Sequence, residues 1–207
     1  MNTEKKILIA FLLNAAFSVF ELVGGILTGS VAILSDALHD LGDAAVIGAS
    51  YFLEKKGGRY SVLGSIITST VLLLGSGLII FRAVGRLLHP VPIHYDGMIL
   101  FAVVGVCVNL GAAYFTREGD SLNQRAVNLH MLEDVLGWAA VLVGAVIMRW
   151  TGFVRIDPLL SMGMATFILV HAIRNLRESI DLFLGKTPLG IDPEAEGGHH
   201  HHHHHHH

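Results

Sequence analysis

The feature that most limits how this chain can fold is a series of long, almost unbroken apolar segments. A helix needs about 20 predominantly apolar residues to cross the hydrocarbon core of a bilayer. Six segments approach or exceed this length, at approximately 7–28, 31–53, 62–83, 98–115, 127–148 and 158–176. Charged residues make up only 15% of the sequence, against about 25% in soluble domains. We therefore predict an all-α fold, a six-helix transmembrane bundle.

Short polar or glycine-containing breaks separate these segments, at 28–30, 54–59, 89–92, 116–120 and 150–152. Connections this short make consecutive helices antiparallel neighbours. We expect residues 1–190 to form one six-span membrane domain, and 191–207 to hold an acidic tail, a Gly-Gly spacer and a nine-histidine purification tag. Of the 14 histidines, the tag accounts for nine, so a metal site must be argued from the positions of the other five.

The distribution of basic residues predicts the orientation of the chain in the membrane. Four of the 14 lysines and arginines lie on one side of the predicted spans: Arg82, Arg86, Arg149 and Arg155. The other ten lie on the side of the N-terminus, and cytoplasmic loops carry the excess of Lys and Arg. We therefore expect both termini in the cytoplasm. Lys5 and Lys6 lead into the first span without a small-residue cleavage site, so we expect no signal peptide.

Ionisable residues are concentrated in three of the predicted spans, where they are costly and usually mark a pathway or a site. They are Glu21 in the first span, Asp36, His39, Asp40 and Asp43 in the second, and His130, Glu133 and Asp134 in the fifth. At 100° per residue, the four in the second span fall within an arc of about 100° on one helix face. The third and fourth spans have none in their interiors.

A His-x-x-x-Asp spacing occurs twice, as His39/Asp43 and as His130/Asp134. On a helix, this spacing places an imidazole and a carboxylate on one face, one turn apart. One such pair is more often an intrahelical hydrogen bond than a ligand pair, but two pairs at membrane depth favour a metal site. Two nitrogen and two oxygen ligands suit tetrahedral Zn²⁺ better than Cu(I), Mg²⁺ or Ca²⁺. The single cysteine excludes a cysteine-based zinc cluster.

The remaining ionisable residues have more than one interpretation. Asp36, Asp40, Glu21 and Glu133 are candidates for proton carriers or for residues that support the ligands. For Glu21, a proton carrier and a hydrogen-bonded structural acid remain equally open. Asp157 precedes Pro158 at the start of the sixth span, where an acid suits a helix N-terminus. The other native histidines are interpreted as surface or interfacial residues: His89, His94 and His171.

At these motifs the chain resembles the cation diffusion facilitator family. The resemblance rests on SVAILSDALHDLGD at 30–43, LHMLED at 129–134, IDP at 156–158 and RLLHP at 86–90. It implies that the four motif residues bind the transported metal, and histidine at both first positions resembles the zinc-preferring branch. A short, histidine-free connection at 116–124 resembles prokaryotic members.

The resemblance also implies a homodimer in the inner membrane of a prokaryote. Family members commonly continue into a cytosolic metal-binding domain, which we expect this short chain to lack. The implied substrate is Zn²⁺, with no organic cofactor and no nucleic-acid partner.

Charge bookkeeping at the predicted site suggests how such a protein works. Two aspartates and two neutral histidines carry a charge of −2, which either Zn²⁺ or two protons neutralise. A bare −2 site is strongly disfavoured inside a membrane, so we predict a metal/proton antiporter that works by alternating access. The alternatives are an intramembrane zinc metalloenzyme and a metal-binding membrane fragment that does not transport. The metalloenzyme alternative lacks support, because the sequence contains no His-Glu-x-x-His motif and four protein ligands leave no open coordination position on the zinc for a water.

Overall fold

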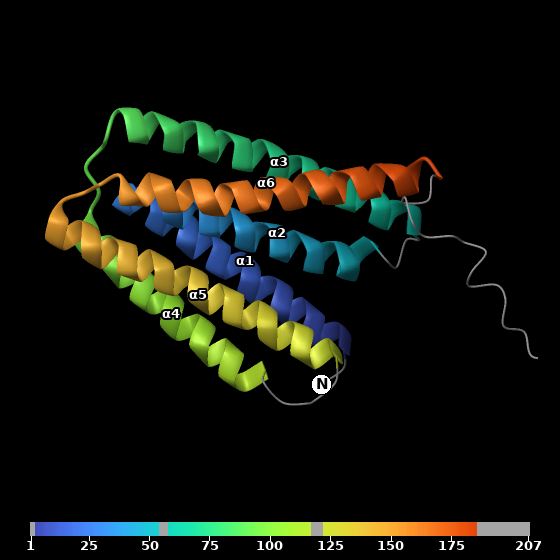
Figure 1. Cartoon of the computed structure of the whole chain (residues 1–207). Coiled ribbons are helices and arrows are strands. Elements are labelled where there is room, and N and C mark those ends of the chain that lie inside the picture. The colour runs from blue at the N-terminus through green and yellow to red at the C-terminus, as the bar shows by residue number, and fades with distance from the viewer. Residues whose placement is uncertain (1–2, 54–57, 117–121, 186–207) are drawn as a thin grey trace, which may run out of the picture.

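The computed structural model describes residues 3–53, 58–116 and 122–185. Within these ranges the chain forms six helices and no strand (Figure 1). The helices are α1 (Thr3–Thr28), α2 (Val31–Leu53), α3 (Gly58–Leu88), α4 (Tyr95–Thr116), α5 (Leu122–Thr151) and α6 (Ile156–Phe183). The predicted all-α, six-helix bundle is therefore confirmed. Most of the helices extend past the apolar segments, because their polar end turns continue the same backbone hydrogen bonding.

Five of these helices are long and apolar enough to cross a membrane. They contain Leu8–Thr28, Gly58–Leu88, Tyr95–Tyr114, Met131–Thr151 and Ile156–Phe183. The exception, α2, has 23 residues and is about 35 Å long, enough for a hydrocarbon core of about 30 Å. Its three aspartates make α2 too polar to be counted as a membrane span by composition alone. Because α2 packs against α1, α3 and α6, other helices bury Asp36 and Asp40, whereas Asp43 stays partly exposed.

The helices associate mainly as three pairs. Helix α3 packs most extensively on α6, α1 on α2, and α4 on α5, whereas α2 and α5 touch only locally. Figure 1 shows α5 and α6 close together at the turn that joins them and separating toward their other ends. The bundle is thus tight at one end and spread at the end that holds the start of α1 and the end of α6.

The tight end contains the hydrophobic core, where α2, α4 and α5 meet. Its buried side chains include Ile33, Met98, Trp138 and Met148. A Cβ atom on Gly105 would lie only 2.3 Å from the Trp138 ring, so this glycine lets α4 approach α5 closely. Small residues serve the same purpose at helix contacts inside lipid bilayers.

A fully buried carboxylate joins α6 to the start of α2. Asp157 lies in the first turn of α6, as expected, but it binds the N-terminus of α2. The Ser30 hydroxyl donates to Asp157 Oδ1 at 2.6 Å, and the Val31 N–H donates to Oδ2 at 2.8 Å. Ser30 Oγ also accepts the Ile33 N–H at 3.1 Å, as an N-cap residue does. The carboxylate therefore complements the positive end of the α2 dipole from a helix more than 120 residues away.

A second contact holds the same end of the bundle. The Arg86 guanidinium on α3 donates to the carbonyl of Gly29, which has a φ of 75° in the turn between α1 and α2. Arg155 donates through Nε to the carbonyl of Leu87 at 3.0 Å. These bonds tie the α1–α2 turn, the end of α3 and the start of α6 together.

Candidate metal site

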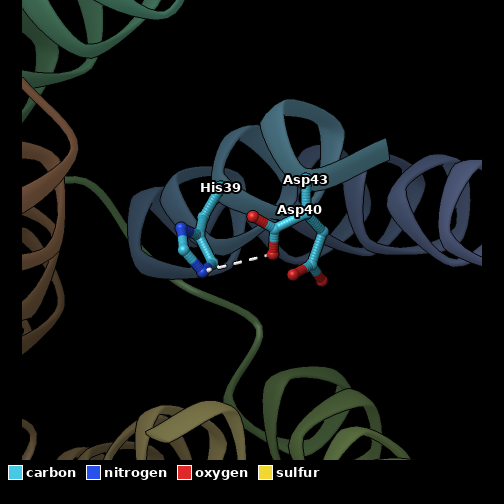
Figure 2. Close-up of side chains that lie close together, drawn as sticks. All are labelled: His39, Asp40 and Asp43. Carbon is cyan, nitrogen blue, oxygen red and sulfur yellow. Dashed lines mark ion pairs between the residues drawn. The ribbon is translucent and has the colours of Figure 1, made fainter. Parts of the chain in front are cut away.

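Helix α2 brings two of the predicted ligands together by its own geometry. His39 Nε2 lies 3.6 Å from Asp43 Oδ2, one helical turn away (Figure 2). Both side chains are partly exposed, at 28% and 31%. The separation is too long for a hydrogen bond. It is close to the distance of about 3.3 Å between two donors that each lie about 2.0 Å from a tetrahedral zinc ion.

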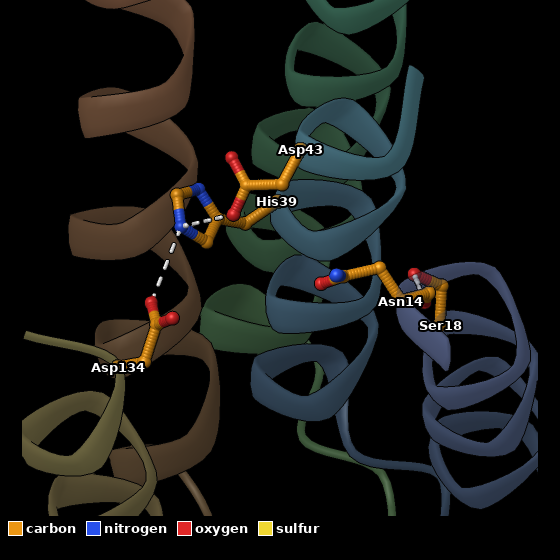
Figure 3. Close-up of polar contacts among 5 residues, drawn as sticks. All are labelled: Asn14, Ser18, His39, Asp43 and Asp134. Atoms are coloured by element: carbon orange, nitrogen blue, oxygen red, sulfur yellow. Dashed lines mark hydrogen bonds and ion pairs between the residues drawn. The ribbon is translucent and has the colours of Figure 1, made fainter. Parts of the chain in front are cut away.

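Helix α5 contributes a third predicted ligand to the same cluster. Asp134 Oδ1 lies 3.6 Å from His39 Nε2, and its side chain is 19% exposed. Figure 3 shows His39 between Asp43 of its own helix and Asp134 of the facing helix. One imidazole and two carboxylates thus converge where α2 and α5 make their limited contact.

The fourth predicted ligand, His130, belongs to α5, one turn before Asp134. Its side chain lies outside the described part of the structure. The four-ligand set therefore stays a prediction, of which the structure brings three members together.

A cavity of about 350 Å³ opens beside the cluster, between α2, α5 and α6. It is lined by Asp36, His39, Glu133, Asp134, Gly137, Gly163, Met164, Phe167 and Ile168. A Cβ atom on Gly137 or Gly163 would meet nothing within 4 Å, so both glycines keep the cavity wide. An ion that enters this cavity would meet the side chains of Asp36, His39, Glu133 and Asp134.

A second group of carboxylates lies beside the first on α2. Glu21 from α1 meets Asp36 and Asp40, and one carboxylate oxygen from each lies within 4.8 Å of the other two. Glu21 is fully buried, Asp36 is 7% exposed and Asp40 is 9% exposed. Asp40 also has an oxygen within 4.8 Å of donors of His39 and Asp43, so the two groups are contiguous. The fourth candidate of this kind, Glu133, is exposed and lines the cavity.

Other polar contacts near the site were not predicted. Ser35 on α2 and Ser161 on α6 share a buried hydrogen bond of 2.8 Å, and Asp157 caps α2 from α6. A lone serine carries no sequence signal for such a pairing. His171 is exposed, as expected, and its ring lies 4.2 Å from the Phe167 ring, which lines the cavity. His94 accepts the Gly97 N–H at 2.9 Å and so caps the start of α4.

These features define a multi-pass membrane protein with a polar cluster at membrane depth. Residues 7–184 match the family described as the cation efflux transmembrane domain, and the chain belongs to that family. This confirms the family resemblance read from the motifs.

Curated relatives agree with this assignment. The chain is 33% identical to the zinc transporter ZitB of Pectobacterium atrosepticum over 94% of its own length and 65% of the relative's. It is 31% identical to the ZitB of Escherichia coli, over 92% of this chain and 66% of the relative. It is also 31% identical to a "cadmium, cobalt and zinc/H(+)-K(+) antiporter" of Bacillus subtilis, over 91% of this chain and 66% of the relative.

The chain thus spans about 65% of the length of these relatives. Their names and the family are those of transporters, which confirms the prediction that the chain is not an enzyme.

Proposed function

We propose that this protein exports divalent cations, with Zn²⁺ as its main substrate, in exchange for protons. The metal would be held by His39, Asp43, His130 and Asp134 while the protein alternates between two access states. The observation that carries the proposal is the convergence of His39, Asp43 and Asp134 from two helices, with donor separations of 3.6 Å. The zinc and antiporter names of the relatives support the same substrate class.

The donor chemistry supports zinc over harder ions. Imidazole nitrogen suits Zn²⁺, whereas Mg²⁺ and Ca²⁺ prefer sites made only of oxygen. His130 is one turn from Asp134 on α5, so it is in register to supply the fourth ligand of a tetrahedron. All four donors come from helices and none from a loop, which keeps their spacing reproducible from one transport cycle to the next.

Charge neutralisation explains how zinc export would be linked to proton import. Metal ligands must be deprotonated, so zinc binding releases protons and proton binding releases zinc. The bare site carries −2 and is the state that a low-dielectric surrounding disfavours most. Reorientation is then favourable with zinc or with protons in the site, and unfavourable with neither.

The helix arrangement supports alternating access. The α2, α3 and α6 ends near Asp157 and Arg86 are tied by buried or partly buried hydrogen bonds. At the other end α5 and α6 separate (Figure 1). The cavity beside His39 is lined by residues of α2, α5 and α6. We infer that this conformation admits ions from the side of the termini. Export would then require the spread end to close and the tied end to open.

Three related proposals concern the protein in its membrane. We place it in the inner membrane of a prokaryote, because the short, histidine-free connection at 116–124 resembles prokaryotic members of the family. We place both termini in the cytoplasm because of the distribution of basic residues. We also propose a homodimer, because α3 has an exposed apolar face that includes Leu74, Leu78 and Phe81. Crosslinking in lipid that finds only monomer at all protein concentrations would contradict the dimer.

The test of transport uses sealed proteoliposomes with an imposed proton gradient and protein without the histidine tag. We expect zinc to move against the proton flow, and Asp134→Ala to stop this movement. Glu178→Ala, which removes an exposed acid on α6, is the matched control and should transport normally. Zinc counterflow separates transport from binding alone. Normal transport by Asp134→Ala would show that the proposed site is wrong.

A further inference from the structure

The carboxylates that the transport site does not use form a compact group inside the bundle. Glu21, Asp36 and Asp40 come from two helices that pack extensively on each other, and their oxygens lie within 4.8 Å of one another. Glu21 is fully buried, and neither of its oxygens has a hydrogen-bond partner among the described residues. Asp36 Oδ2 is likewise buried without a partner. Such groups are rare in proteins and call for an explanation.

Neighbouring polar groups do not supply the missing partners. Asn14 and Ser18 lie one to two turns before Glu21 on the same face of α1. The Asn14 amide donates to the Ala10 carbonyl at 2.9 Å, and the Ser18 hydroxyl donates to the Asn14 carbonyl at 2.8 Å (Figure 3). The Ser18 hydroxyl and one of the two amide N–H groups of Asn14 are therefore used by their own helix. Three carboxylates this close cannot all be ionised in a low-dielectric interior unless positive charge joins them.

We propose that Glu21, Asp36 and Asp40 form a second cation site, which binds a hard divalent ion such as Mn²⁺ or Ca²⁺. The proposal goes beyond the transport function and does not require it. Three oxygens within 4.8 Å of one another leave a point at most about 2.8 Å from each of them. Small side-chain shifts reach the Ca²⁺–oxygen range of about 2.3–2.6 Å. Carboxylates alone favour Mg²⁺, Ca²⁺ or Mn²⁺ over zinc.

The position of this second site relates it to the first without merging the two. Asp40 lies next to His39 in sequence, and its carboxylate is close to the donors of both groups. A cation bound by Glu21, Asp36 and Asp40 would reduce the negative charge beside His39 and Asp43. We therefore expect the second site to weaken zinc binding at the first when it is filled.

The experiment measures binding of Mn²⁺ alone, by its electron paramagnetic resonance spectrum, to tag-free protein in lipid nanodiscs. The parent protein carries Asp43→Ala and Asp134→Ala, which remove the zinc site. We expect about one Mn²⁺ per chain, and Glu21→Gln to weaken its binding at least about tenfold. Glu178→Gln makes the same chemical change on the exposed surface of α6 and should leave Mn²⁺ binding unchanged.

Folding and the transport proposal are controlled separately. The single variant Glu21→Gln should still bind zinc at the intact first site, and such binding shows that the variant is folded. If Glu21→Gln does not fold, the Mn²⁺ measurement is made on Asp36→Asn instead. Absence of Mn²⁺ binding in the parent, or equal binding in Glu21→Gln, would overturn the second site and leave protons as the neutralising charge. Failure of the transport proposal appears instead in the proteoliposome assay, as no proton-driven zinc movement by the unmodified protein, or as normal zinc transport by Asp134→Ala.

Discussion

The two carboxylate groups on α2 are close together but differ in donors, burial and access. His39 and Asp43 are about 30% exposed, and His39 meets Asp134 of α5 and lines a cavity of about 350 Å³. Asp36 and Asp40 are less than 10% exposed and meet Glu21 of α1. One group combines nitrogen with oxygen, and the other has only oxygen.

This difference shows how one helix serves two purposes. The four ionisable residues of α2 cover about 100° of its circumference, so neighbouring sectors face different helices. The contact of α2 with α5 is small and leaves a cavity beside His39, whereas its contact with α1 is extensive and buries Glu21 against Asp36 and Asp40. A transported ion must enter and leave, so it needs the partly exposed group beside the cavity. A cation that remains bound through the transport cycle is compatible with the buried group of Glu21, Asp36 and Asp40.

The largest expected effect distinguishes the two groups directly. Asp43→Ala removes a ligand and half of the carboxylate charge of the proposed zinc site, so zinc would keep an uncompensated positive charge. We expect zinc transport in proteoliposomes to fall by more than about 100-fold, since even residues that only orient a ligand are typically worth 10–100-fold. Mn²⁺ binding at Glu21 should persist. Wild-type zinc transport by this variant would remove Asp43 from the site.

A change at the start of α2 should affect both groups together. Asp157→Ala leaves the Ser30 hydroxyl and the Val31 N–H without their buried acceptor. We expect unfolding to become easier by about 1–3 kcal/mol, measured as a lower midpoint of thermal unfolding in detergent. Zinc and Mn²⁺ affinities should fall by similar factors, because both sites depend on α2. A loss confined to zinc would show that Asp157 acts on the first site alone.

A change of donor type should alter selectivity more than rate. His39→Asp keeps the number of ligands but replaces nitrogen by oxygen, which makes the first group resemble the second. We expect the preference for Zn²⁺ over Mn²⁺ to fall by about tenfold, because carboxylates suit harder ions. Competition between the two metals during uptake measures this ratio. If the variant keeps wild-type selectivity, the four proposed ligands are not contradicted, but the nitrogen donor of His39 does not determine which metal is preferred.

The smallest expected effect concerns access. Gly163→Leu fills part of the cavity beside His39 and Asp134, where a Cβ atom meets nothing within 4 Å. We expect zinc transport to slow by roughly threefold, because the leucine side chain narrows the cavity without touching a proposed ligand. A rate change of this size corresponds to less than about 1 kcal/mol in the activation barrier. Mn²⁺ binding at Glu21 should not change, because Glu21 is fully buried and Asp36 is the member of its group that lines the cavity. A loss of both would mean that one route serves both sites.

Much of the fold and part of the site could be predicted from local pattern. Six apolar segments of sufficient length predicted the six helices, because backbone polar groups inside a bilayer must be satisfied within the segment. The spacing of His39 and Asp43 predicted their proximity, since residues four apart share a helix face. Helix ends were predicted less well: α3 begins at Gly58 and α6 ends at Phe183, beyond the apolar residues.

Contacts between helices were decided by the tertiary structure. The sequence alone determined that α2 carries an imidazole and three carboxylates on one face. Only packing decided that Asp134 meets His39, that Glu21 closes against Asp36 and Asp40, and that Asp157 caps α2. The reason is physical: periodicity within a helix follows from 3.6 residues per turn. The partner of each face depends on which helices approach closely, and that depends on side-chain packing across the whole bundle, as where Gly105 meets Trp138.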